Sequence, residues 1–351
     1  MSELDDPRRY EQFDCSDMAH LLAELPAQAR RAWAEAQSWE IPPSLTRPRR
    51  VVVTGVGGSA IGGDVVAEVA ATRTEVPVQV LRRREPPLSD EHTLVVACSF
   101  SGSTEEALAA LNSAAEAGSM CIAVTTGGPL AEAAEAQELP LFRYSCDGPP
   151  RTAFGYGALP LLAFLQRLGV LDMGATEIES TFAALTRAGQ AWGVDAPLST
   201  NRAKQLACRI DGRAPVVIGV DFLAVAARRW AAQTNENAKQ WAFHLELPEI
   251  DHNLIEGLRQ PIALRDSIHA ILLDSPAIEP RSRMRVQSTA ELLREAGVET
   301  DNVVVEHDGV LESVMCASYL GDWVSYYIAM LNGIDPTPVP VLSGLKASFS
   351  P

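Results

Sequence analysis

The sequence predicts an α/β protein with two parallel β-sheets, each sandwiched between helices and related to the other by internal duplication. Three observations support this class. Between residues 51 and 146, apolar runs of strand length alternate with segments of helical periodicity, which is typical of a parallel sheet with crossover helices. A buried strand and its turn near Gly55 recur around Gly219. The chain of 351 residues is long enough for two ordinary domains.

Residues 1–48 are predicted to form an N-terminal helical segment. Within it, residues 18–34 place leucine, alanine and tryptophan at helical spacing. Pro26 is expected to kink or split this helix, and Pro42-Pro43 ends it.

Residues 49–152 are predicted to form the first sheet domain. Its opening strand, at residues 50–54, contains a run of valines of the kind that a parallel sheet buries on both faces. Further strands are expected at residues 78–81, 93–99, 120–125 and 141–144, and helices at residues 60–71, 104–117 and 130–136.

Residues 153–200 are predicted to connect the two halves, and residues 201–351 to form the second sheet domain with a C-terminal helix and tail. The connecting helices are expected at residues 158–168 and 178–192. In the second domain, strands are expected at residues 214–220, 268–273 and 302–305, and helices at residues 222–232, 281–296 and 314–331. A polar stretch at residues 234–239 is expected to interrupt the helix after the first of these strands.

Charge and composition exclude several classes of protein. The formal net charge of −16 argues against a nucleic-acid or anionic-membrane partner, because both bind clustered Lys and Arg. No apolar run reaches the roughly 18 to 20 residues that span a bilayer. The N-terminal residues lack the basic and apolar regions of a signal peptide, so we expect a cytoplasmic protein. The six cysteines include no C-x-x-C pair, which predicts neither a metal site nor a disulfide framework.

The turn after the first strand has the composition of an anion-binding loop. Gly55, Gly57 and Gly58 let a ligand approach the backbone closely. The helix that begins near Ser59 directs its free N–H groups and positive dipole end at that ligand. In the second half, residues 221–223 replace the glycines and serine, so only the first half is predicted to bind phosphate.

A second candidate phosphate loop follows the strand at residues 93–99. Ser99, Ser101, Ser103 and Thr104 bring four hydroxyls to the same edge of the sheet. Hydroxyls and backbone N–H groups can surround a single phosphate without a large compensating charge. Taken alone, this stretch is more typical of a helix-capping loop, with Ser103 or Thr104 as the cap and Glu106 in the first turn. The neighbouring glycine turn favours the phosphate site.

A dinucleotide site is a competing interpretation. Residues 55–60 match the pattern G-x-G-x-x-A, and the run Arg82–Arg84 could meet a 2′-phosphate. A dinucleotide fold does not need the hydroxyl cluster at residues 99–104, so a single phosphate is favoured. An NADP-dependent oxidoreductase stays as an alternative.

Four other polar residues carry no clear signal by themselves. Glu236 and His252 lie in polar stretches, Arg151 follows two prolines, and Lys346 lies near the end of the chain. Side chains of these types are most often simply solvated. Composition and spacing therefore leave their roles open.

Taken together, these stretches make the chain resemble the bifunctional phosphoglucose/phosphomannose isomerase family, which is built from two sugar isomerase (SIS) domains. The glycine turn and the serine loop are shared by many SIS proteins and indicate a sugar phosphate. The resemblance covers nearly the whole chain, and its more specific motifs lie at residues 150–156, 235–239, 247–253 and 345–346.

The resemblance implies a role for each matching residue. The residues that would bind the substrate phosphate are Gly58, Ser59, Ser99, Ser101 and Thr104. Arg151 would stabilise developing negative charge, and Glu236 would move a proton between C1 and C2. His252 and Lys346 would open the sugar ring, with His252 supplied by the neighbouring subunit of a homodimer. Thr337 is the implied determinant of activity toward mannose 6-phosphate.

The implied reaction is a metal-independent isomerisation of glucose 6-phosphate or mannose 6-phosphate to fructose 6-phosphate, without a cofactor. One carboxylate poised over adjacent carbons can remove the C2 proton and return it at C1 through a cis-enediol(ate). A guanidinium then stabilises the charge as it develops. Because the intermediate has lost its C2 stereochemistry, the same base can serve both aldoses.

A sugar-phosphate-binding SIS protein without catalysis is a further alternative. The chain has no helix-turn-helix or basic DNA-reading segment, which argues against a DNA-bound sensor. Phe100 and Ser103 stand where the family commonly has tyrosine and asparagine or aspartate, so the substrate fit of this loop is expected to differ.

Overall fold

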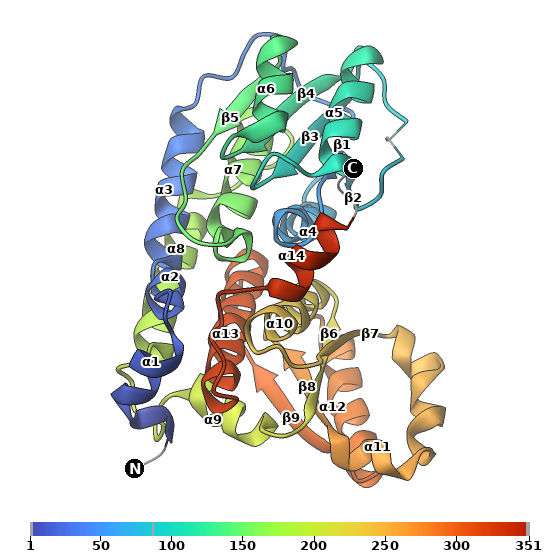
Figure 1. The fold of residues 1–351 in the computed structure, drawn as a ribbon. Coiled ribbons are helices and arrows are strands. Elements are labelled where there is room, and N and C mark those ends of the chain that lie inside the picture. The colour runs from blue at the N-terminus through green and yellow to red at the C-terminus, as the bar shows by residue number, and fades with distance from the viewer. Residues whose placement is uncertain (1–2, 86–87, 349–351) are drawn as a thin grey trace. The chain divides into compact units, whose positions relative to one another are not determined.

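The computed structural model describes residues 3–85 and 88–348, and the chain divides into two compact units (Figure 1). The β1–β5 unit consists of Glu24–Thr186 and Gly309–Glu312, and the β6–β9 unit consists of Met1–Ala23, Arg187–Asp308 and Ser313–Pro351. The first helices of the chain therefore belong to the same unit as its C-terminal half. The domain boundaries at residues 48, 152 and 200 stay a prediction.

The first sheet is parallel, with the strand order β2-β1-β3-β4-β5. Its strands are β1 (Arg50–Thr54), β2 (Val78–Leu81), β3 (Thr93–Ser99), β4 (Met120–Thr125) and β5 (Leu141–Arg143). Each lies where the sequence predicts a strand. Every residue of β3 and β4 is buried, as expected for central strands covered on both faces.

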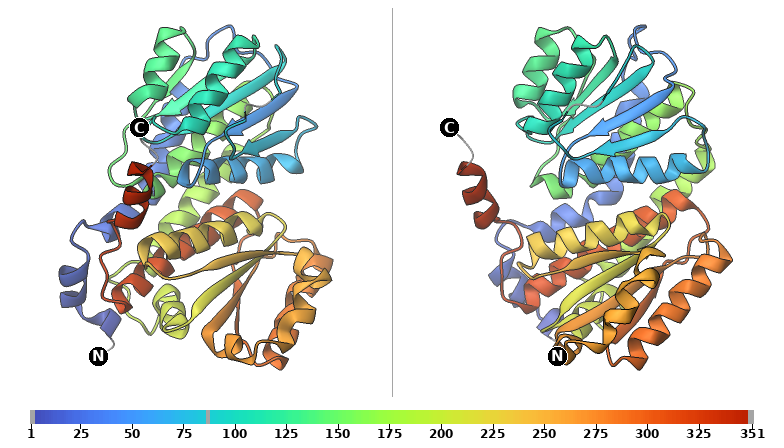
Figure 2. Two further views of the ribbon diagram at one scale, coloured as in Figure 1. Left: turned by 45° about the vertical axis from the view of Figure 1, so that its right-hand side comes forward. Right: turned by 90° about the vertical axis from the view of Figure 1, so that its right-hand side faces the viewer.

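Helices cover both faces of this sheet (Figure 2). The helices of the unit are α3 (Leu25–Ser38), α4 (Gly58–Ala71), α5 (Glu105–Glu116), α6 (Gly128–Ala136), η2 (Pro150–Thr152), α7 (Phe154–Arg167) and the start of α8 (Ala175–Trp192). α5 and α6 pack on the face that carries Val52, Val95 and Ala123. α4 and α7 cover the opposite face, which carries Val51 and Val53. Successive side chains thus alternate between the two cores.

Two glycines allow α4 and α7 to cross in close contact. A Cβ atom placed on Gly62 would lie 2.0 Å from the carbonyl oxygen of Gly157. A Cβ atom placed on Gly157 would lie 3.7 Å from the Cα of Gly62. The crossing is therefore a backbone-to-backbone contact, and it holds the helix that follows the glycine turn.

The second sheet repeats the arrangement of the first. Its strands are β6 (Ala214–Val220), β7 (Phe243–Leu247), β8 (Ile268–Asp274) and β9 (Glu299–Val304). Their order, β7-β6-β8-β9, is that of the first four strands of the first sheet, and all pairs are parallel. This shared order agrees with the predicted internal duplication.

Helices on both faces also cover the second sheet (Figure 2). The helices of the β6–β9 unit are η1 (Glu3–Asp5), α1 (Pro7–Phe13), α2 (Met18–Ala23), α9 (Arg202–Ile210), α10 (Leu223–Asn237), η3 (Glu249–His252), η4 (Leu254–Arg259), α11 (Ile262–Ser267), α12 (Pro280–Glu295), most of α13 (Val310–Leu331) and α14 (Pro340–Ala347). The crossover β6–α10–β7 runs in one direction across the sheet and the crossover β8–α12–β9 runs in the other. Because such crossovers are right-handed, α10 and α12 lie on opposite faces.

One predicted helix is split as expected and another is longer than predicted. The helix predicted over residues 18–34 is two helices, α2 and α3. The break lies directly before Pro26, which is in the first turn of α3 and has no N–H to continue α2, so the predicted split at this proline is confirmed. The helix after β6 does not stop at the polar stretch but continues to Asn237, with Gln233 and Asn237 on its buried face.

Several elements were not predicted, among them α9, α11, β7 and α14. β7 is an edge strand whose Phe243, His244 and Glu246 are exposed, so its sequence lacks an apolar run. Lys346 lies within α14 and not in an irregular tail.

Three kinds of feature are absent from residues 3–85 and 88–348. No helix there is long and apolar enough to cross a membrane. No group of three or more His, Cys, Asp or Glu side chains in this part of the chain could hold a metal ion. No disulfide joins the cysteines of these residues.

Candidate active site

The carboxyl ends of β1 and β3 meet at the point where the first sheet changes direction. The two strands are neighbours, and the chain passes from β1 toward β2 but from β3 toward β4. In open parallel sheets, ligands bind in the crevice that this divergence opens at the carboxyl ends of the strands. The glycine turn follows β1 and the serine loop follows β3, so the structure brings both predicted phosphate loops to this crevice.

The glycine turn lies close to neighbouring backbone on two sides. Gly57 has a φ of 55°, in the left-handed region that favours glycine. A Cβ atom on Gly55 would lie 2.7 Å from the carbonyl oxygen of Cys98 on β3. A Cβ atom on Gly58 would lie 3.2 Å from the carbonyl oxygen of Pro150. The turn therefore packs against β3 on one side and the 150–152 segment on the other.

Hydroxyl groups tie the turn to the serine loop. The backbone N–H of Phe100 donates to Ser59 Oγ at 3.2 Å. Ser99 Oγ and Thr104 Oγ1 lie 2.7 Å apart, and the Thr104 N–H donates to Ser99 Oγ at 3.4 Å. Ser101 is exposed. The five residues predicted to bind phosphate thus all lie on two connected loops.

Two helices begin at these loops. α4 starts at Gly58 and α5 starts at Glu105. Neither helix is capped by a side chain. The cap residue of α4 is Gly57, which has no side chain, and the hydroxyl of Thr104, the cap residue of α5, contacts Ser99 instead. The capping-loop interpretation is therefore not supported, and the N-termini of both helices point toward the crevice, although the Ala60 N–H of α4 is already bonded to the Gly57 carbonyl oxygen at 3.1 Å.

Arg151 is buried beside the glycine turn, with 4% of its surface exposed. Its Cα lies 3.4 Å from the position of a Cβ on Gly58. Gln28 of α3 holds this segment, because its Nε2 donates to the carbonyl oxygen of Thr152 at 3.0 Å and its Oε1 accepts from the Gly155 N–H at 2.8 Å. Arg151 therefore lies in the protein interior next to the glycine turn and not in solvent.

A small pocket adjoins these groups. It is lined by Gly58, Ser59, Cys98, Ser99, Phe100, Val124, Tyr144, Pro150, Ala153, Tyr156 and Gly157. Burial raises the pKa of the Cys98 thiol to about 12. Burial, together with the hydrogen bond to Glu35, raises the pKa of Tyr156 to about 12 as well. Both groups are therefore neutral near pH 7, and Cys98 is not a thiolate nucleophile.

The corresponding point of the second sheet carries acidic groups. Asp274, at the end of β8, is buried and accepts hydrogen bonds from Arg283 at 2.8 and 3.0 Å. Its Oδ1 also accepts from the Ser275 N–H at 2.7 Å. Asp221 follows β6. The glycine turn of the first sheet has no counterpart after β6, and phosphate binding by the first sheet alone stays a prediction.

Two arginines of the run after β2 lie near carboxylates. Arg82 forms an ion pair with Asp64 of α4, and Arg84 lies 3.8 Å from Glu105. A dinucleotide 2′-phosphate would have to displace these partners. The pairing does not favour the NADP interpretation.

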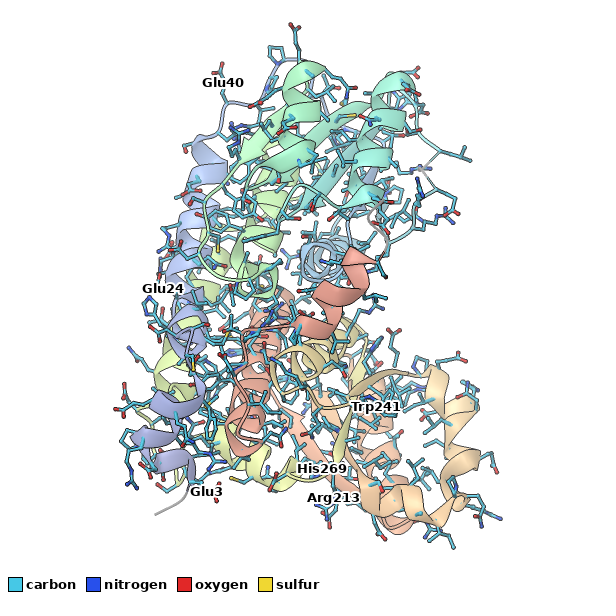
Figure 3. All side chains as sticks on the ribbon, viewed as in Figure 1. Glu3, Glu24, Glu40, Arg213, Trp241 and His269 are labelled. Atoms are coloured by element: carbon cyan, nitrogen blue, oxygen red, sulfur yellow. The ribbon has the colours of Figure 1, made fainter. Side chains whose placement is uncertain are left out.

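Glu236 lies half-buried in the last turn of α10. Its neighbour Asn235 holds the loop that follows, since its Nδ2 donates to the carbonyl oxygens of Ala231 at 2.8 Å and Ala242 at 3.0 Å. Trp241, labelled in Figure 3, is 78% exposed on this loop. The predicted base therefore lies in helical backbone, and the hydrogen bonds of Asn235 hold the loop that follows it.

Lys239 joins the end of α10 to the segment that carries Thr337. Its Nζ donates to the carbonyl oxygens of Asn237 at 3.3 Å, Asp335 at 2.9 Å and Pro336 at 3.0 Å. The Thr337 N–H donates to Asp335 Oδ1 at 2.9 Å. A cation is favourable at a helix C-terminus. The structure thus brings the predicted specificity residue near the helix end that carries the predicted base.

His252 and Lys346 are exposed on other elements of the same unit. His252 ends η3, and the preceding Asp251 anchors η3 to α12 through Thr289 Oγ1 at 2.9 Å and Arg285 at 3.4 Å. Lys346 lies in the last turn of α14. The predicted phosphate ligands and Arg151 belong to the β1–β5 unit, whereas the predicted proton-transfer residues belong to the β6–β9 unit.

Sequence reasoning missed two residues that shape the site. Gln28 lies in a helix and no local pattern marks its buried contacts. Lys239 belongs to the motif at residues 235–239, and a lysine just beyond a helix end is a recognisable capping signal.

Two connected phosphate loops at the switch point of a parallel sheet, with a second sheet of the same strand order, define the class of double-sheet α/β proteins that bind phosphorylated ligands. Residues 199–349 match the family model described as the bacterial phospho-glucose isomerase C-terminal SIS domain. A solved structure, that of a hypothetical protein from Thermus thermophilus, has the same fold, with a TM-score of 0.76 and 18% identity over 97% of this chain and 92% of that one.

Curated relatives identify the family within this class. The chain is 32% identical over 331 residues to the bifunctional phosphoglucose/phosphomannose isomerase of Caldicellulosiruptor bescii, covering 94% of this chain and 98% of the relative. It is also 31% identical over 234 residues to the D-glucosamine-6-phosphate 4-epimerase of Sulfolobus acidocaldarius, covering 64% of this chain and 68% of that relative. The chain belongs to the bifunctional phosphoglucose/phosphomannose isomerase family.

Proposed function

We propose that the protein is an aldose–ketose isomerase that interconverts glucose 6-phosphate and mannose 6-phosphate with fructose 6-phosphate. The observation that carries the proposal is the cradle at the carboxyl ends of β1 and β3, where hydroxyls, glycines and two helix N-termini converge. Such a cradle is suited to one phosphate group. The family of the chain supports a hexose phosphate as the ligand.

Phosphate binding is assigned to the two loops of the cradle. The assigned ligands are Gly58, Ser59, Ser99, Ser101 and Thr104. The backbone N–H groups at the starts of α4 and α5 add donors and a positive dipole end. This cradle anchors the sugar and takes no part in proton transfer.

Proton transfer is assigned to Glu236. Its carboxylate would remove the C2 proton and return it at C1 through a cis-enediol(ate), a route that needs no metal or other cofactor. Arg151 would stabilise the oxyanion of this intermediate. Thr337 would contact the sugar where glucose and mannose configurations differ, which is supported by its link to the end of α10 through Lys239.

Ring opening is assigned to His252 and Lys346, and we propose a homodimer in which His252 acts in the site of the other subunit. The exposed position of His252 supports this assignment. Large apolar side chains on the preceding stretch, Trp241 at 78% and Phe243 at 49% exposure, are of the kind that subunit interfaces bury. We also propose that the enzyme acts in the cytoplasm, since its phosphorylated substrates do not cross a bilayer unaided.

The direct test is incubation of the purified protein with fructose 6-phosphate and excess EDTA. Glucose 6-phosphate and mannose 6-phosphate are the expected products, together with exchange of the C2 proton when the solvent is deuterium oxide. A protein that binds fructose 6-phosphate without product or exchange would instead be a non-catalytic binding protein. Glucosamine 6-phosphate serves as a comparison substrate, and NADPH is expected to leave the melting temperature unchanged.

Two variants test the assignment of the base. Glu236→Gln is expected to lose at least a hundredfold in kcat, because the amide cannot accept the proton. Glu295→Gln, at an exposed position of α12, is the matched control and is expected to keep full activity. Full activity of Glu236→Gln would contradict the assignment.

Mixing two inactive variants tests the shared site. In a dimer of one Glu236→Gln subunit and one His252→Asn subunit, one of the two sites combines an intact glutamate with an intact histidine. If subunits exchange at random, the mixture is expected to regain about a quarter of the wild-type activity. A mixture that stays inactive after subunit exchange would contradict the shared site.

A further inference from the structure

A buried polar cluster joins α10 to α13 in the β6–β9 unit. Arg229 and Asp322 are 2% and 1% exposed, and the guanidinium lies 2.8 Å from Asp322 Oδ2. Gln233 Nε2 donates to the other oxygen, Asp322 Oδ1, also at 2.8 Å. Both oxygens of this carboxylate therefore accept hydrogen bonds from α10.

The cluster extends to the last turn of α10. Ser325 Oγ donates to the carbonyl oxygen of Asp322 at 2.7 Å and accepts from Asn237 Nδ2 at 2.9 Å. Arg229, Gln233 and Asn237 are spaced four residues apart and so lie along one face of the helix. This face is bonded to α13 over the last three turns of α10.

A close apolar contact reinforces the polar one. Trp230 is buried, and its Nε1 donates to the carbonyl oxygen of Ala317 at 2.6 Å. A Cβ atom on Gly321 would lie 2.1 Å from Trp230 Cδ1, so only glycine lets the indole lie this close to α13. Sliding or rotating α10 would break this contact and the polar cluster together.

Glu236 is carried by the segment that this cluster holds. It directly precedes Asn237 and follows Gln233 by three residues, so both bonded side chains flank it within one turn. The last turn of a helix lacks intrahelical partners for its carbonyls and tends to fray. A general base must keep its place relative to the reacting carbons, and a misplacement of about 1 Å can cost on the order of a hundredfold in rate.

We propose that Asp322 is a positioning residue that fixes Glu236 through Arg229 and Gln233, and that the bond between Asn237 and Ser325 is a second link to α13 that does not depend on the Asp322 carboxylate. The physical reason is that a buried ion pair contributes little stability beyond that of an apolar pair of similar volume, because desolvation offsets its attraction. Its directional hydrogen bonds do fix the rotation and register of the helix. This inference rests on the proposed function, since it takes Glu236 as the base.

Three variants disrupt the cluster in different ways. Asp322→Asn keeps an acceptor for Gln233 but removes the charge that faces Arg229. The double variant Arg229→Met/Asp322→Leu replaces the pair with apolar side chains of similar volume, so that it folds even where a lone buried charge would not be tolerated. Ser325→Ala removes the link to Asn237 and the bond to the Asp322 carbonyl oxygen but leaves the carboxylate contacts of Asp322 intact.

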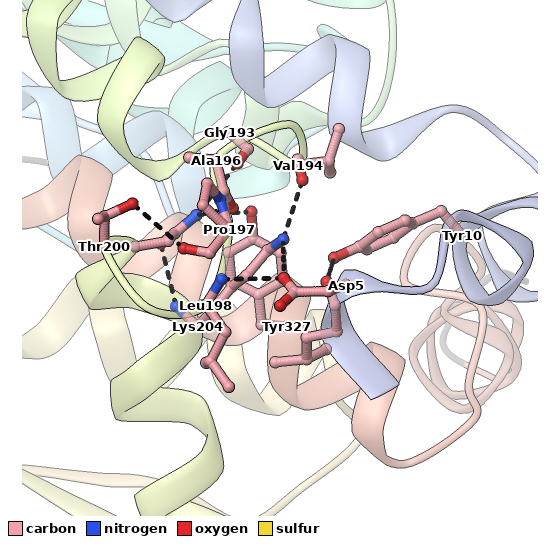
Figure 4. Close-up of polar contacts among 12 residues, drawn as sticks. Asp5, Tyr10, Gly193, Val194, Ala196, Pro197, Leu198, Thr200, Lys204 and Tyr327 are labelled. Atoms are coloured by element: carbon pink, nitrogen blue, oxygen red, sulfur yellow. Dashed lines mark hydrogen bonds and ion pairs between the residues drawn. The ribbon is translucent and has the colours of Figure 1, made fainter. Parts of the chain in front are cut away.

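Lys204→Met is the matched control. Lys204 is 1% exposed and forms an ion pair with the partly exposed Asp5 at 3.1 Å, and its Nζ also donates to the carbonyl oxygen of Val194 at 2.9 Å (Figure 4). These partners belong to the same unit as α10 but not to α10 itself. The control therefore removes one buried charge, that of Lys204, without changing a contact of α10.

Two readouts separate positioning from general stability. Steady-state kinetics with fructose 6-phosphate are expected to show a fall in kcat of at least tenfold for Asp322→Asn and for the double variant, with KM within about threefold of wild type. Amide hydrogen exchange followed by mass spectrometry is expected to show faster exchange in the peptide that covers residues 230–238. Ser325→Ala is expected to give smaller changes of the same kind, and Lys204→Met a lower melting temperature with unchanged kcat and unchanged exchange in that peptide.

A folded double variant with wild-type kcat and wild-type exchange in that peptide would overturn the inference. A fall in kcat of the same size in Lys204→Met would also overturn it, since the effect would then be general destabilisation. Wild-type protein that shows no isomerase activity would refute the proposed function instead. Hydrogen exchange would still report whether Asp322 holds the end of α10.

Discussion

Replacing Gly62 by alanine tests whether the crossing of α4 and α7 supports the phosphate cradle. The added Cβ would lie 2.0 Å from the carbonyl oxygen of Gly157, 2.1 Å from its carbonyl carbon and 2.8 Å from the N of Ala158. All three are backbone atoms, so no side chain can turn away. Carbon and oxygen in contact lie roughly 3.3 Å apart, so the two helices would have to separate by about 1.3 Å.

The expected cost follows from two opposing effects. Overpacking of this kind costs about 3 kcal/mol, at the upper end of its usual range, because the obstacle is backbone. Alanine gains about 1 kcal/mol over glycine inside a helix, which leaves a net loss of about 2 kcal/mol. For a unit of this size, that loss corresponds to a melting temperature lower by about 4 to 8 °C.

The same displacement is expected to weaken substrate binding. α4 begins at Gly58 in the cradle, and the segment that leads into α7 contains Arg151. Separating the two helices lengthens their contacts to the phosphate, and losing the equivalent of one hydrogen bond to a charged group raises KM by roughly tenfold. Calorimetry and initial rates with fructose 6-phosphate measure the two effects.

Gly174→Ala is the control for this substitution. A Cβ atom at Gly174 meets no heavy atom within 4 Å, in the same unit of the chain. Its melting temperature is expected to fall by no more than about 2 °C, with unchanged KM. If Gly62→Ala matched this control in both measurements, the reasoning about the crossing would be refuted.

Two further predictions concern single polar groups. Ser59→Ala is expected to raise KM for fructose 6-phosphate by roughly 10- to 100-fold, because a hydrogen bond to a charged group contributes about 1.5 to 3 kcal/mol. Ser44→Ala, at an exposed position of the same unit outside both loops, is expected to stay within twofold in the same assay, and equal effects would contradict the assigned phosphate contacts. Burial alone would raise the pKa of Asp301, but hydrogen bonds from His269 at 2.9 Å and Arg209 at 2.8 Å outweigh it and lower the pKa to about 2. The stabilisation is therefore complete above about pH 4 and lost as the pH falls through about 2, so Asp301→Asn should cost roughly 2 kcal/mol at neutral pH and almost nothing near pH 2. Denaturant unfolding at both pH values checks this, and a pH-independent difference would count against it.

Most strands could be predicted because their signal is local. β1, β3 and β4 are short runs of apolar, largely β-branched residues, which suit a sheet buried on both faces. β7 escaped prediction because an edge strand keeps side chains such as Phe243 in solvent. The end of α10 was mistaken for an interruption because Gln233 and Asn237, although polar, face the core and bond to α13.

The two phosphate loops were predictable for the same local reason. Their glycines and hydroxyls directly follow two strands, and the rules of parallel sheets bring the ends of such strands to one edge. The burial of Arg151 could not be predicted, because an arginine after two prolines is usually solvated. Tertiary contacts reverse that expectation.

The sequence by itself thus determined where the strands end, and with them which loops meet at the crevice. Only the tertiary structure decided how the surrounding segments are held. Gln28 contacts the Arg151 segment across 124 positions of the chain, and Lys239 contacts Asp335 across 96. The physical reason is that such bonds depend on which surfaces pack together after folding. A pattern that spans one helix or one turn carries no information about a partner so far along the chain.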